Sequence, residues 1–350
     1  MKAVEMTGYG GPEMLLYDEV ADPVPAADEA LIAVEAAAVN HLDLDLRDGS
    51  SRIPLELPHI LGLEGAGRVR ALPSGYEGPL RVGSRALIVE DIPCGACLQC
   101  RLGRANLCED SEWTGVSRSG TYAELIAAPV DGLIPLPGDR TAAEWATVQG
   151  TFGTAWHMLV TRGAVRPDEW VLVNAVGSGI GSAALQVARL AGAKVIATAG
   201  SEEKLERARV LGAAGTANYS TESIGEAVAE LTGGIGVDLV FEHVGGQVFV
   251  DSLRALRTGG RMATCGAHGG EHVDLDVIEL FRAERTIIGS MSVTPSEVEH
   301  VVAMVGAGQL DPVIDRELPL SAAAEAHRIL AAREAYGKVI LKPEIYEGMQ

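Results

Sequence analysis

Between residues 170 and 290 the chain alternates short apolar runs with helical patterns, and this alternation constrains the fold more than any other feature. The run "WVLVNAV" (170–176) predicts a buried strand, and "IGSAALQVARLAG" (180–192) predicts the helix that follows it. Similar runs recur as "KVIATAG", "VDLVFEHVGG", "RMATCG" and "RTIIGSM". Alternating strands and helices with short connections predict a doubly wound parallel sheet of the α/β class.

The first 150 residues have a different texture. Stretches such as "ALIAVEAAAVN" (30–40) and "GAGRVRAL" (65–72) predict short strands between glycine and proline turns, and therefore a mostly antiparallel β domain. The stretch "TAAEWATVQGTFGTAWHMLVTRG" (141–163) predicts a long helix capped by Thr141. Beyond Ser292 we expect two helices and a final strand in "GKVILKP" (337–343). These patterns divide the chain into residues 1–150, 151–291 and 292–350.

A glycine-rich turn joins the first strand of the alternating region to its helix. Gly177, Gly179 and Gly181 stand in "VNAVGSGIGSAAL". Without a Cβ the backbone can approach a pyrophosphate, whose charge then lies at the helix N-terminus. At this first strand–helix junction the pattern predicts a dinucleotide site that includes Ser178 and Ile180, although glycines can also serve a tight turn alone.

The end of the next predicted strand bears on which dinucleotide binds. An NAD site normally has an acidic residue there to accept hydrogen bonds from the ribose hydroxyls. This chain has "ATAGSEEK" (197–204), with Ser201 at that point. Lys204, one turn into the following helix, could reach a 2′-phosphate. We therefore expect NADPH in preference to NADH, the alternative for Lys204 being a solvated surface lysine.

Four of the five cysteines lie within "CGACLQCRLGRANLC" (94–108). Thiolates at this spacing can surround one Zn²⁺ tetrahedrally. An iron–sulfur cluster is the competing interpretation, but the last gap is too long for the ferredoxin pattern and no proline follows. Disulfides do not suit a reducing compartment. The predicted ligands of one structural Zn²⁺ are Cys94, Cys97, Cys100 and Cys108.

Net charge and composition limit the classes of binding partner that we expect. With 28 Lys+Arg against 48 Asp+Glu the formal net charge is −20, which repels nucleic acid and anionic lipid. No apolar run is long enough to span a bilayer, and the first residues lack the pattern of a secretory signal. We expect a cytoplasmic protein with a small-molecule substrate and neither a nucleic-acid nor a membrane partner.

The chain also resembles the medium-chain dehydrogenase/reductase superfamily along essentially its whole length. The resemblance implies a GroES-like β domain, a Rossmann domain, and a C-terminal return to the first domain. It also implies a homodimer or a tetramer, and a structural zinc held by the cysteine lobe away from the active site. Beside the cysteine stretch and the glycine turn, the matching segments are "VNHLDLDLRDG" (39–49), "LPHILGLEGAGRV" (57–69), "GTYAELIAAP" (120–129) and "YGKVILKP" (336–343).

The sequence departs from the zinc alcohol dehydrogenases of that superfamily where a catalytic zinc is bound. Asn40, Leu63 and Gln149 stand where ligands are expected, and only Glu64 matches. Leucine cannot bind zinc and amides are poor ligands for it, so we expect no catalytic zinc. A displaced site built from His41, His59, Asp45 and Glu64 is the alternative.

The resemblance assigns roles to individual residues. The zinc-free quinone oxidoreductase branch has an Asn and an Asp at the positions of Asn40 and Asp43, and there the amide lines the nicotinamide and substrate site. Asp45 falls where zinc enzymes have a proton-relay residue, so it is a candidate acid, or else a solvated carboxylate. The resemblance also implies that Lys338 faces the cofactor phosphates; for Lys338, Thr154 and Tyr219 a packing or surface role is the alternative. The other residues assigned to the cofactor are Thr154, Tyr219, Val244, Gly266 and Ser290.

Hydride acceptors that need no Lewis acid fit a site without catalytic zinc. Quinones and α,β-unsaturated carbonyls are already electrophilic, and the product enolate needs only hydrogen-bond donors and a proton. The expected function is an NADPH-dependent reductase of such compounds. A zinc alcohol dehydrogenase with atypical ligands and a non-catalytic NADPH-binding protein are the two alternatives.

Overall fold

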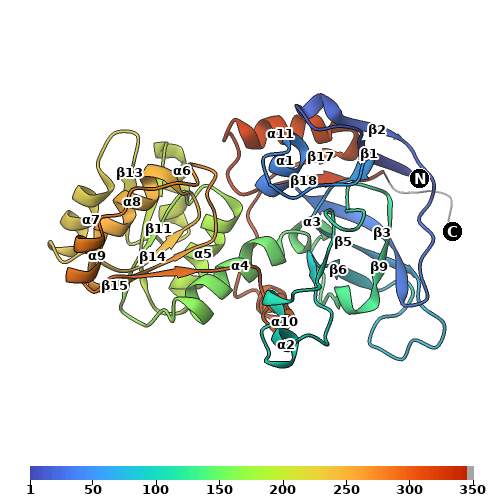
Figure 1. Ribbon diagram of the computed structural model, residues 1–350, viewed down its shortest axis with the longest axis horizontal. Helices are drawn as coiled ribbons and strands as arrows, with labels where there is room; N and C mark the ends of the chain where they lie inside the picture. The colour runs from blue at the N-terminus through green and yellow to red at the C-terminus, as the bar shows by residue number, and fades with distance from the viewer. Residues whose placement is uncertain (345–350) are drawn as a thin grey trace. The chain divides into compact units, whose positions relative to one another are not determined.

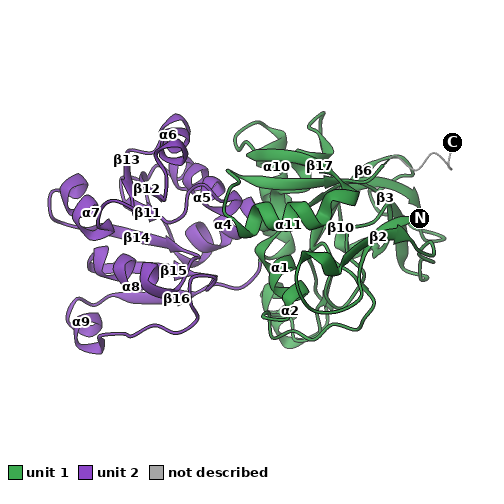
Figure 2. Cartoon of the chain, turned by 90° about the horizontal axis from the view of Figure 1, so that it is seen from above, with its two compact units in different colours: residues 1–150, 293–350 green, residues 151–292 purple. Residues whose placement is uncertain are grey.

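The computed structural model describes residues 1–344 and divides into two compact units (Figures 1 and 2). The first unit contains Met1–Gly150 and Val293–Gln350, and the second contains Thr151–Ser292. The chain therefore leaves the first unit once and returns to it. Its crossing points lie at residues 150/151 and 292/293, beside the expected boundaries after residues 150 and 291.

The second unit is built on a six-stranded parallel sheet. Numbered within the unit, the strand order is 3-2-1-4-5-6, the order of a doubly wound dinucleotide-binding sheet. This confirms the α/β prediction from the alternating pattern. From one edge to the other the strands are β13 (Gly215–Asn218), β12 (Lys194–Ala199), β11 (Trp170–Val173), β14 (Val237–Glu242), β15 (Leu256–Thr264) and β16 (Thr286–Gly289).

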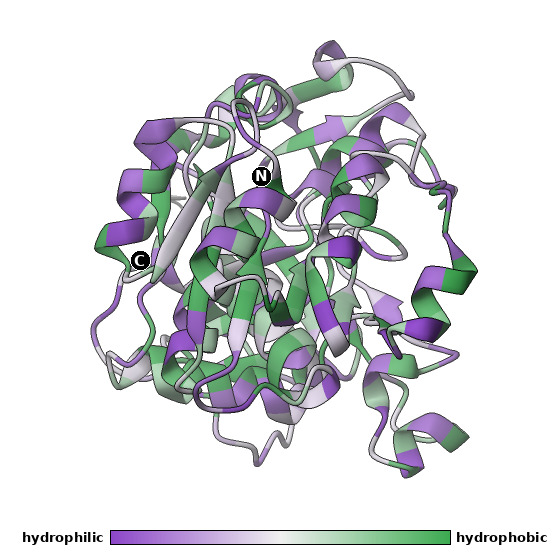
Figure 3. Cartoon of the chain, turned by 90° about the vertical axis from the view of Figure 1, so that its left-hand side faces the viewer, coloured by the Kyte–Doolittle hydropathy of each residue, from purple (hydrophilic) through white to green (hydrophobic). Residues whose placement is uncertain are grey.

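Helices connect these strands, and several begin at a polar cap that the sequence provides. The side chains of Ser178, Ser201 and Ser223 each accept a backbone N–H three residues ahead. The helices are α4 (Thr154–Trp156), α5 (Gly179–Leu190), α6 (Glu202–Val210), α7 (Ile224–Thr232), α8 (Gly246–Ala255) and α9 (Val277–Arg282). Apolar side chains of β11, β12, β14 and β15 pack in one core with those of α7 and α8, and Figure 3 shows polar and apolar residues alternating along the helices.

The first unit is mainly antiparallel. Its central strand, β3 (Glu29–Ala38), pairs with β5 (Glu64–Ala71) on one side and with β9 (Leu125–Pro129) and then β18 (Lys338–Lys342) on the other. The C-terminal segment thus completes the sheet of the N-terminal one. The remaining strands are β10 (Leu133–Pro135), β6 (Arg85–Ile88) and β17 (Ile314–Pro319) in this sheet, β2 (Leu15–Glu19), β1 (Lys2–Met6) and β4 (His59–Ile60) in a second sheet, and the pair β7 (Asp91–Ile92) and β8 (Glu112–Trp113).

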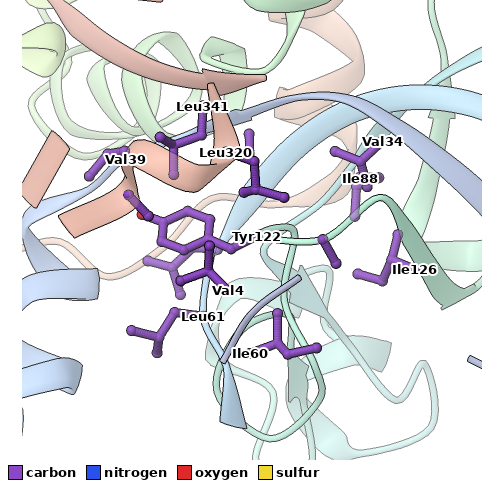
Figure 4. Packing of buried hydrophobic residues seen from close by; sticks show 14 of the residues in the cluster. Val4, Val34, Val39, Ile60, Leu61, Ile88, Tyr122, Ile126, Leu320 and Leu341 are labelled. Atoms are coloured by element: carbon purple, nitrogen blue, oxygen red, sulfur yellow. The ribbon is translucent and has the colours of Figure 1, made fainter. Parts of the chain in front are cut away.

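One apolar core joins the sheets and helices of the first unit. Figure 4 shows Tyr122 among aliphatic side chains, with Leu61 and Val4 near its ring. Tyr122 and Leu61 are fully buried. Because burial of such side chains removes apolar surface from water, this core stabilises the unit. The helices here are α1 (His41–Asp48), α2 (Leu98–Arg101), α3 (Ala142–Trp145), α10 (Pro295–Gly306) and α11 (Ala323–Ala331).

The predicted helix over residues 141–163 is interrupted. Thr141 caps its start, as expected, and accepts the N–H of Glu144. After α3 the chain forms a π-helical turn at Gln149–Gly153, then α4, then a second π-helical turn at His157–Arg162. The first π turn has a visible cause, because the N–H of Gly150 donates to Glu64 Oε2 at 2.8 Å instead of continuing an α-helical ladder.

Among the described residues, no helix is both long enough and apolar enough to cross a bilayer.

Candidate functional site

The glycine turn of the second unit lies between β11 and α5. The Ser178 side chain caps α5 by accepting the N–H of Gly181 at 2.9 Å. A Cβ on Gly181 would lie 2.5 Å from the carbonyl oxygen of Ala175, and one on Gly177 would lie 2.7 Å from Cδ of Lys204. Gly181 is therefore too tight for a side chain because backbone closes it in, whereas Gly177 lies under the flexible side chain of Lys204. A glycine turn at the start of a twelve-residue helix fits a pyrophosphate.

Small and polar residues follow β12 and β13. Ser201 caps α6, and the ring of Tyr219 lies against Gly200, where a Cβ would be 3.0 Å from Cε2. Glu202 pairs with Arg209 at 2.6 Å and Glu203 with Arg207 at 3.4 Å, so the carboxylates of both acids are engaged by arginines on their own helix.

Lys204 thus lies against Gly177 of the glycine turn, Tyr219 lies against Gly200, and Ser201 rather than an acid follows β12. The ends of two adjacent strands thus supply a hydroxyl, a phenol and an ammonium group, and none of the three repels a phosphate. The group fits a phosphorylated ribose.

The other residues assigned to the cofactor from the sequence also gather at one edge. They follow the carboxyl ends of parallel strands, where open α/β sheets bind ligands. The hydroxyl of Ser290 is buried there without a hydrogen-bond partner in the described part of the chain, so it is available to a ligand. Val244 follows β14, Gly266 follows β15 and Ser290 follows β16, while Thr154 begins α4, which contacts α5.

In the first unit, three side chains from distant segments meet. Lys338 Nζ donates to Asn40 Oδ1 at 2.7 Å and to Glu64 Oε1 at 2.9 Å. Asn40 Nδ2 lies 3.3 Å from the same Glu64 oxygen. Because an ammonium can only donate, the oxygen of Asn40 must face Lys338, which fixes the orientation of the amide. Glu64 is fully buried and the side chain of Lys338 is 8 % exposed.

This cluster occupies the region in which the catalytic zinc ligands were expected. Leu63 is 2 % exposed and belongs to the apolar core, and Gln149 is also 2 % exposed. The Gln149 side chain accepts the backbone N–H of Glu90 at 3.0 Å. The cation beside Glu64 is therefore the ammonium of Lys338. Two of its three N–H groups donate hydrogen bonds to Asn40 and Glu64, and the third has no acceptor within residues 1–344.

Lys338 is engaged by a carboxylate of its own unit. The resemblance implies that this lysine faces the cofactor phosphates, and this stays a prediction; within the first unit its ammonium lies in a buried ion pair with Glu64. The physical reason is Glu64, whose fully buried carboxylate requires a charged or hydrogen-bonding partner. The first residue of β18 supplies it.

A buried chain of polar groups supports Asn40 from behind. Asp43 accepts the backbone N–H of Asn40 at 2.8 Å and the hydroxyl of Tyr122 at 3.1 Å. Tyr122 in turn lies 3.3 Å from Nε2 of His327, whose Nδ1 lies 3.1 Å from Arg47. Because arginine only donates, His327 accepts at Nδ1 and must donate from Nε2 to the Tyr122 oxygen. The donor and the acceptor of each hydrogen bond among these side chains are therefore assigned.

Burial shifts the titration of this chain. Loss of hydration, then the charge of Arg47, lowers the pKa of His327 to about 3, so the ring is neutral. Burial raises the pKa of Asp43 to about 6, although hydrogen bonds from Asn40, Tyr122 and Gly62 and the charge of Lys338 oppose the shift. Burial also raises the pKa of Tyr122 well above its ordinary value. These groups hold the loop before α1 in place.

Two further carboxylates lie in this unit. Asp45, the candidate acid from the sequence, is a half-buried residue of α1 whose backbone oxygen accepts the N–H of Gly49. Glu90 was not singled out from the sequence. Burial, followed by the carboxylates of Asp91, Glu64 and Asp43, raises its pKa to about 8, while Lys338 opposes the shift. The only sequence signal for it is an acid that directly follows the buried strand β6 and Val89.

The four clustered cysteines converge in space. One possible ligand atom from each lies within 4.8 Å of all the others, so the group could hold a metal ion. Cys97 and Cys108 have their sulfurs 3.9 Å apart, close to the edge of about 3.8 Å in a tetrahedron with Zn–S bonds of about 2.3 Å. Two backbone N–H groups, of Cys94 and Cys97, donate to neighbouring sulfurs at 3.3 Å. The loop therefore fits a four-thiolate site.

Comparison with known proteins agrees with this geometry. Residues 26–138 match the family model of the alcohol dehydrogenase GroES-like domain, and residues 179–307 match that of the zinc-binding dehydrogenase. The quinone oxidoreductase of Homo sapiens is 30 % identical over 350 residues, covering 97 % of each chain. The chain belongs to the medium-chain dehydrogenase/reductase superfamily.

Other members of the superfamily agree in fold and in type of reaction. The 2-haloacrylate reductase of Burkholderia sp is 31 % identical, over 96 % of this chain and 97 % of that protein. A solved structure described as an NAD-dependent alcohol dehydrogenase is 42 % identical, with a TM-score of 0.94 and coverage of 98 % of this chain and 99 % of that one. This chain is therefore an oxidoreductase with a GroES-like domain and a Rossmann-like domain.

Proposed function

We propose that this oxidoreductase is an NADPH-dependent reductase of quinones or α,β-unsaturated carbonyl compounds that works without a catalytic zinc. The observation that carries the proposal is the Asn40–Glu64–Lys338 cluster, in which a lysine ammonium neutralises the one acid that matches the zinc-binding pattern. With Leu63 in the core and Gln149 bonded to backbone, the remaining positions offer no ligand to a second metal. When bound, the reduced nicotinamide supplies the hydride.

Donors of the first unit suit the product of such a transfer. Addition of hydride to an enone or a quinone puts negative charge on the acceptor oxygen, which hydrogen-bond donors stabilise. Lys338 has one uncommitted proton that can donate to this oxygen, whereas the NH₂ group of Asn40 already donates to Ala38 O and Glu64 Oε1 and holds the lysine and the glutamate in place. The two relatives named as a quinone oxidoreductase and a 2-haloacrylate reductase act on acceptors of these two kinds.

The choice of NADPH rests on the second unit. Ser201 stands where an acid would select the unphosphorylated ribose, Lys204 lies against Gly177, and Tyr219 lies against Gly200. A single structural Zn²⁺ in the cysteine lobe completes the proposed cofactors, because four thiolates leave no open position for substrate.

Purified protein tests the proposal with a panel of quinones, enones, unsaturated acids, aldehydes and alcohols, each with NADPH and NADH in parallel. We expect reduction of quinones or activated alkenes, a preference for NADPH, and one zinc per chain by metal analysis. Binding of NADPH without oxidation across the panel would instead support a non-catalytic nucleotide-binding protein.

A zinc alcohol dehydrogenase with atypical ligands is the second candidate, favoured by the 42 % identical structure described as an NAD-dependent alcohol dehydrogenase. This candidate predicts two zinc ions per chain, oxidation of simple alcohols and loss of that activity on chelation. Such a result would overturn the first proposal.

A further inference from the structure

Glu90 is held rigidly at its backbone but not at its carboxyl group. Its N–H donates to Gln149 Oε1 at 3.0 Å, and its carbonyl oxygen accepts the N–H of Thr114 at 2.9 Å. The residue is half-buried, and its carboxyl group has no hydrogen bond or ion pair with any described residue. A half-buried carboxyl group without a protein partner is available to a ligand.

The surroundings of Glu90 coincide with the site proposed above. Gln149 binds the Glu90 backbone, and the next residue, Gly150, binds Glu64 Oε2 at 2.8 Å. Two adjacent residues of the π-helical turn thus fix Glu90 on one side and the Glu64–Lys338 pair on the other. The turn thus connects the backbone of Glu90, through the Gln149 side chain, to the carboxylate of Glu64, through the Gly150 N–H.

Charged groups from four elements act on the Glu90 carboxyl. Burial and the carboxylates of Asp91 on β7, Glu64 on β5 and Asp43 on α1 raise its pKa to about 8, and the ammonium of Lys338 on β18 lowers it only in part. Glu90 therefore carries its proton at neutral pH, whereas an ordinary glutamate would be ionised. A neutral carboxylic acid can donate a hydrogen bond and then a proton.

We propose that Glu90 is the general acid that protonates the acceptor, a role that rests on the reductase function proposed above. Its carboxyl O–H bond breaks, the proton forms a new O–H bond at the acceptor oxygen, and the carboxylate left behind takes up one proton (H⁺) from solvent. With an enone the enol so formed then tautomerises to the saturated carbonyl compound, with no net gain or loss of protons. The reduced nicotinamide provides the electron pair. One acceptor, one NADPH and one proton thus yield the reduced product and NADP⁺, with Glu90 restored.

The first test needs no cofactor. In an infrared titration of the full chain, the wild-type minus Glu90→Gln difference should contain the band of a protonated carboxyl group that disappears near pH 8. A carboxyl group whose pKa is raised in the folded state gives its full contribution to stability below its ordinary pKa of about 4.5. This contribution is lost as pH rises towards 8. The Tm of Glu90→Gln should therefore gain on that of wild type between pH 5 and pH 8. A carboxyl group already ionised at pH 6 would overturn the proposal.

The second test measures turnover with an acceptor from the panel. Removal of a general acid typically lowers kcat about 10²- to 10⁴-fold, and we expect this in Glu90→Gln with unchanged NADPH binding. Wild-type kcat should fall above pH 8 as Glu90 loses its proton, and Glu90→Asp should recover part of the rate. The matched control is Glu56→Gln, which alters an exposed glutamate of the same unit.

The outcomes separate the two proposals. An active wild type with equal kcat in Glu90→Gln and Glu56→Gln would overturn the role of Glu90 and leave the reductase function intact. A wild type that reduces no acceptor would overturn the reductase function and the role together. A lower kcat in Glu90→Gln, together with loss of the fall in kcat above pH 8, would support both.

Discussion

Replacing Lys338 with Met removes the cation from the buried pair and leaves Glu64 with the N–H of Gly150 at 2.8 Å and the amide of Asn40 at 3.3 Å. For charges 2.9 Å apart the attraction is about 6 kcal/mol at an effective dielectric constant of about 20, before the cost of burial is subtracted. Loss of one partner of a buried pair typically costs about 3–5 kcal/mol. We expect Lys338→Met to lower the unfolding free energy of the first unit by that amount.

The same strand provides the matched control. Lys342 pairs with Glu317 at 3.0 Å, but both side chains are exposed, so Lys342→Met should cost about 0–1 kcal/mol. Native-state hydrogen exchange in urea, followed on β5 and β18, measures both variants and avoids averaging over the two units. The double variant Glu64→Gln/Lys338→Met should be more stable than Lys338→Met alone. Equal costs for the two lysine variants would refute the idea of a desolvated pair.

Three shorter predictions concern other parts of the molecule. The pKa of His327 in the folded state lies below its ordinary value. The contribution of this ring to stability is therefore complete above about pH 6.5, and the free energy of unfolding falls by about 1.4 kcal/mol per pH unit towards pH 3. His327→Gln should lose this slope in urea titrations at acid pH. Chelation of the metal, or Cys97→Ser, should lower Tm and open residues 94–113 to hydrogen exchange while NADPH still binds. Lys204→Ala should weaken NADPH about 10- to 100-fold by calorimetry and leave NADH unchanged, whereas Lys194→Ala should change neither.

The assembly is also a proposal. We expect a homodimer, with a tetramer as the alternative, and sedimentation equilibrium at micromolar concentration should give the mass of two chains. A concentration-independent monomer would contradict it.

Sequence patterns predicted the features that depend on residues close together in the chain. The strands and helices from β11 onward follow from apolar periodicity and serine caps, and the cysteine cluster follows from ligands close together in the sequence. The π-helical turn at Gln149–Gly153 could not be predicted in this way, because its cause is a carboxylate 86 positions earlier in the chain. Periodicity alone therefore indicated one continuous helix.

The polar groups of the first unit depend on contacts between distant segments. His327 lies 205 positions from Tyr122 and 280 positions from Arg47, and Lys338 lies 274 positions from Glu64. No spacing rule relates such residues, so the pairing of Lys338 with Glu64 could not be predicted. Glu90 was overlooked for the same reason, since the charges around it come from four elements, β5, β7, β18 and α1.

Glu64 has two tasks, and this affects how the site can change. One of its carboxylate oxygens accepts the amide that shapes the turn leading to the second unit, and the other neutralises Lys338. A change at Glu64 would release the turn and strand a buried lysine together.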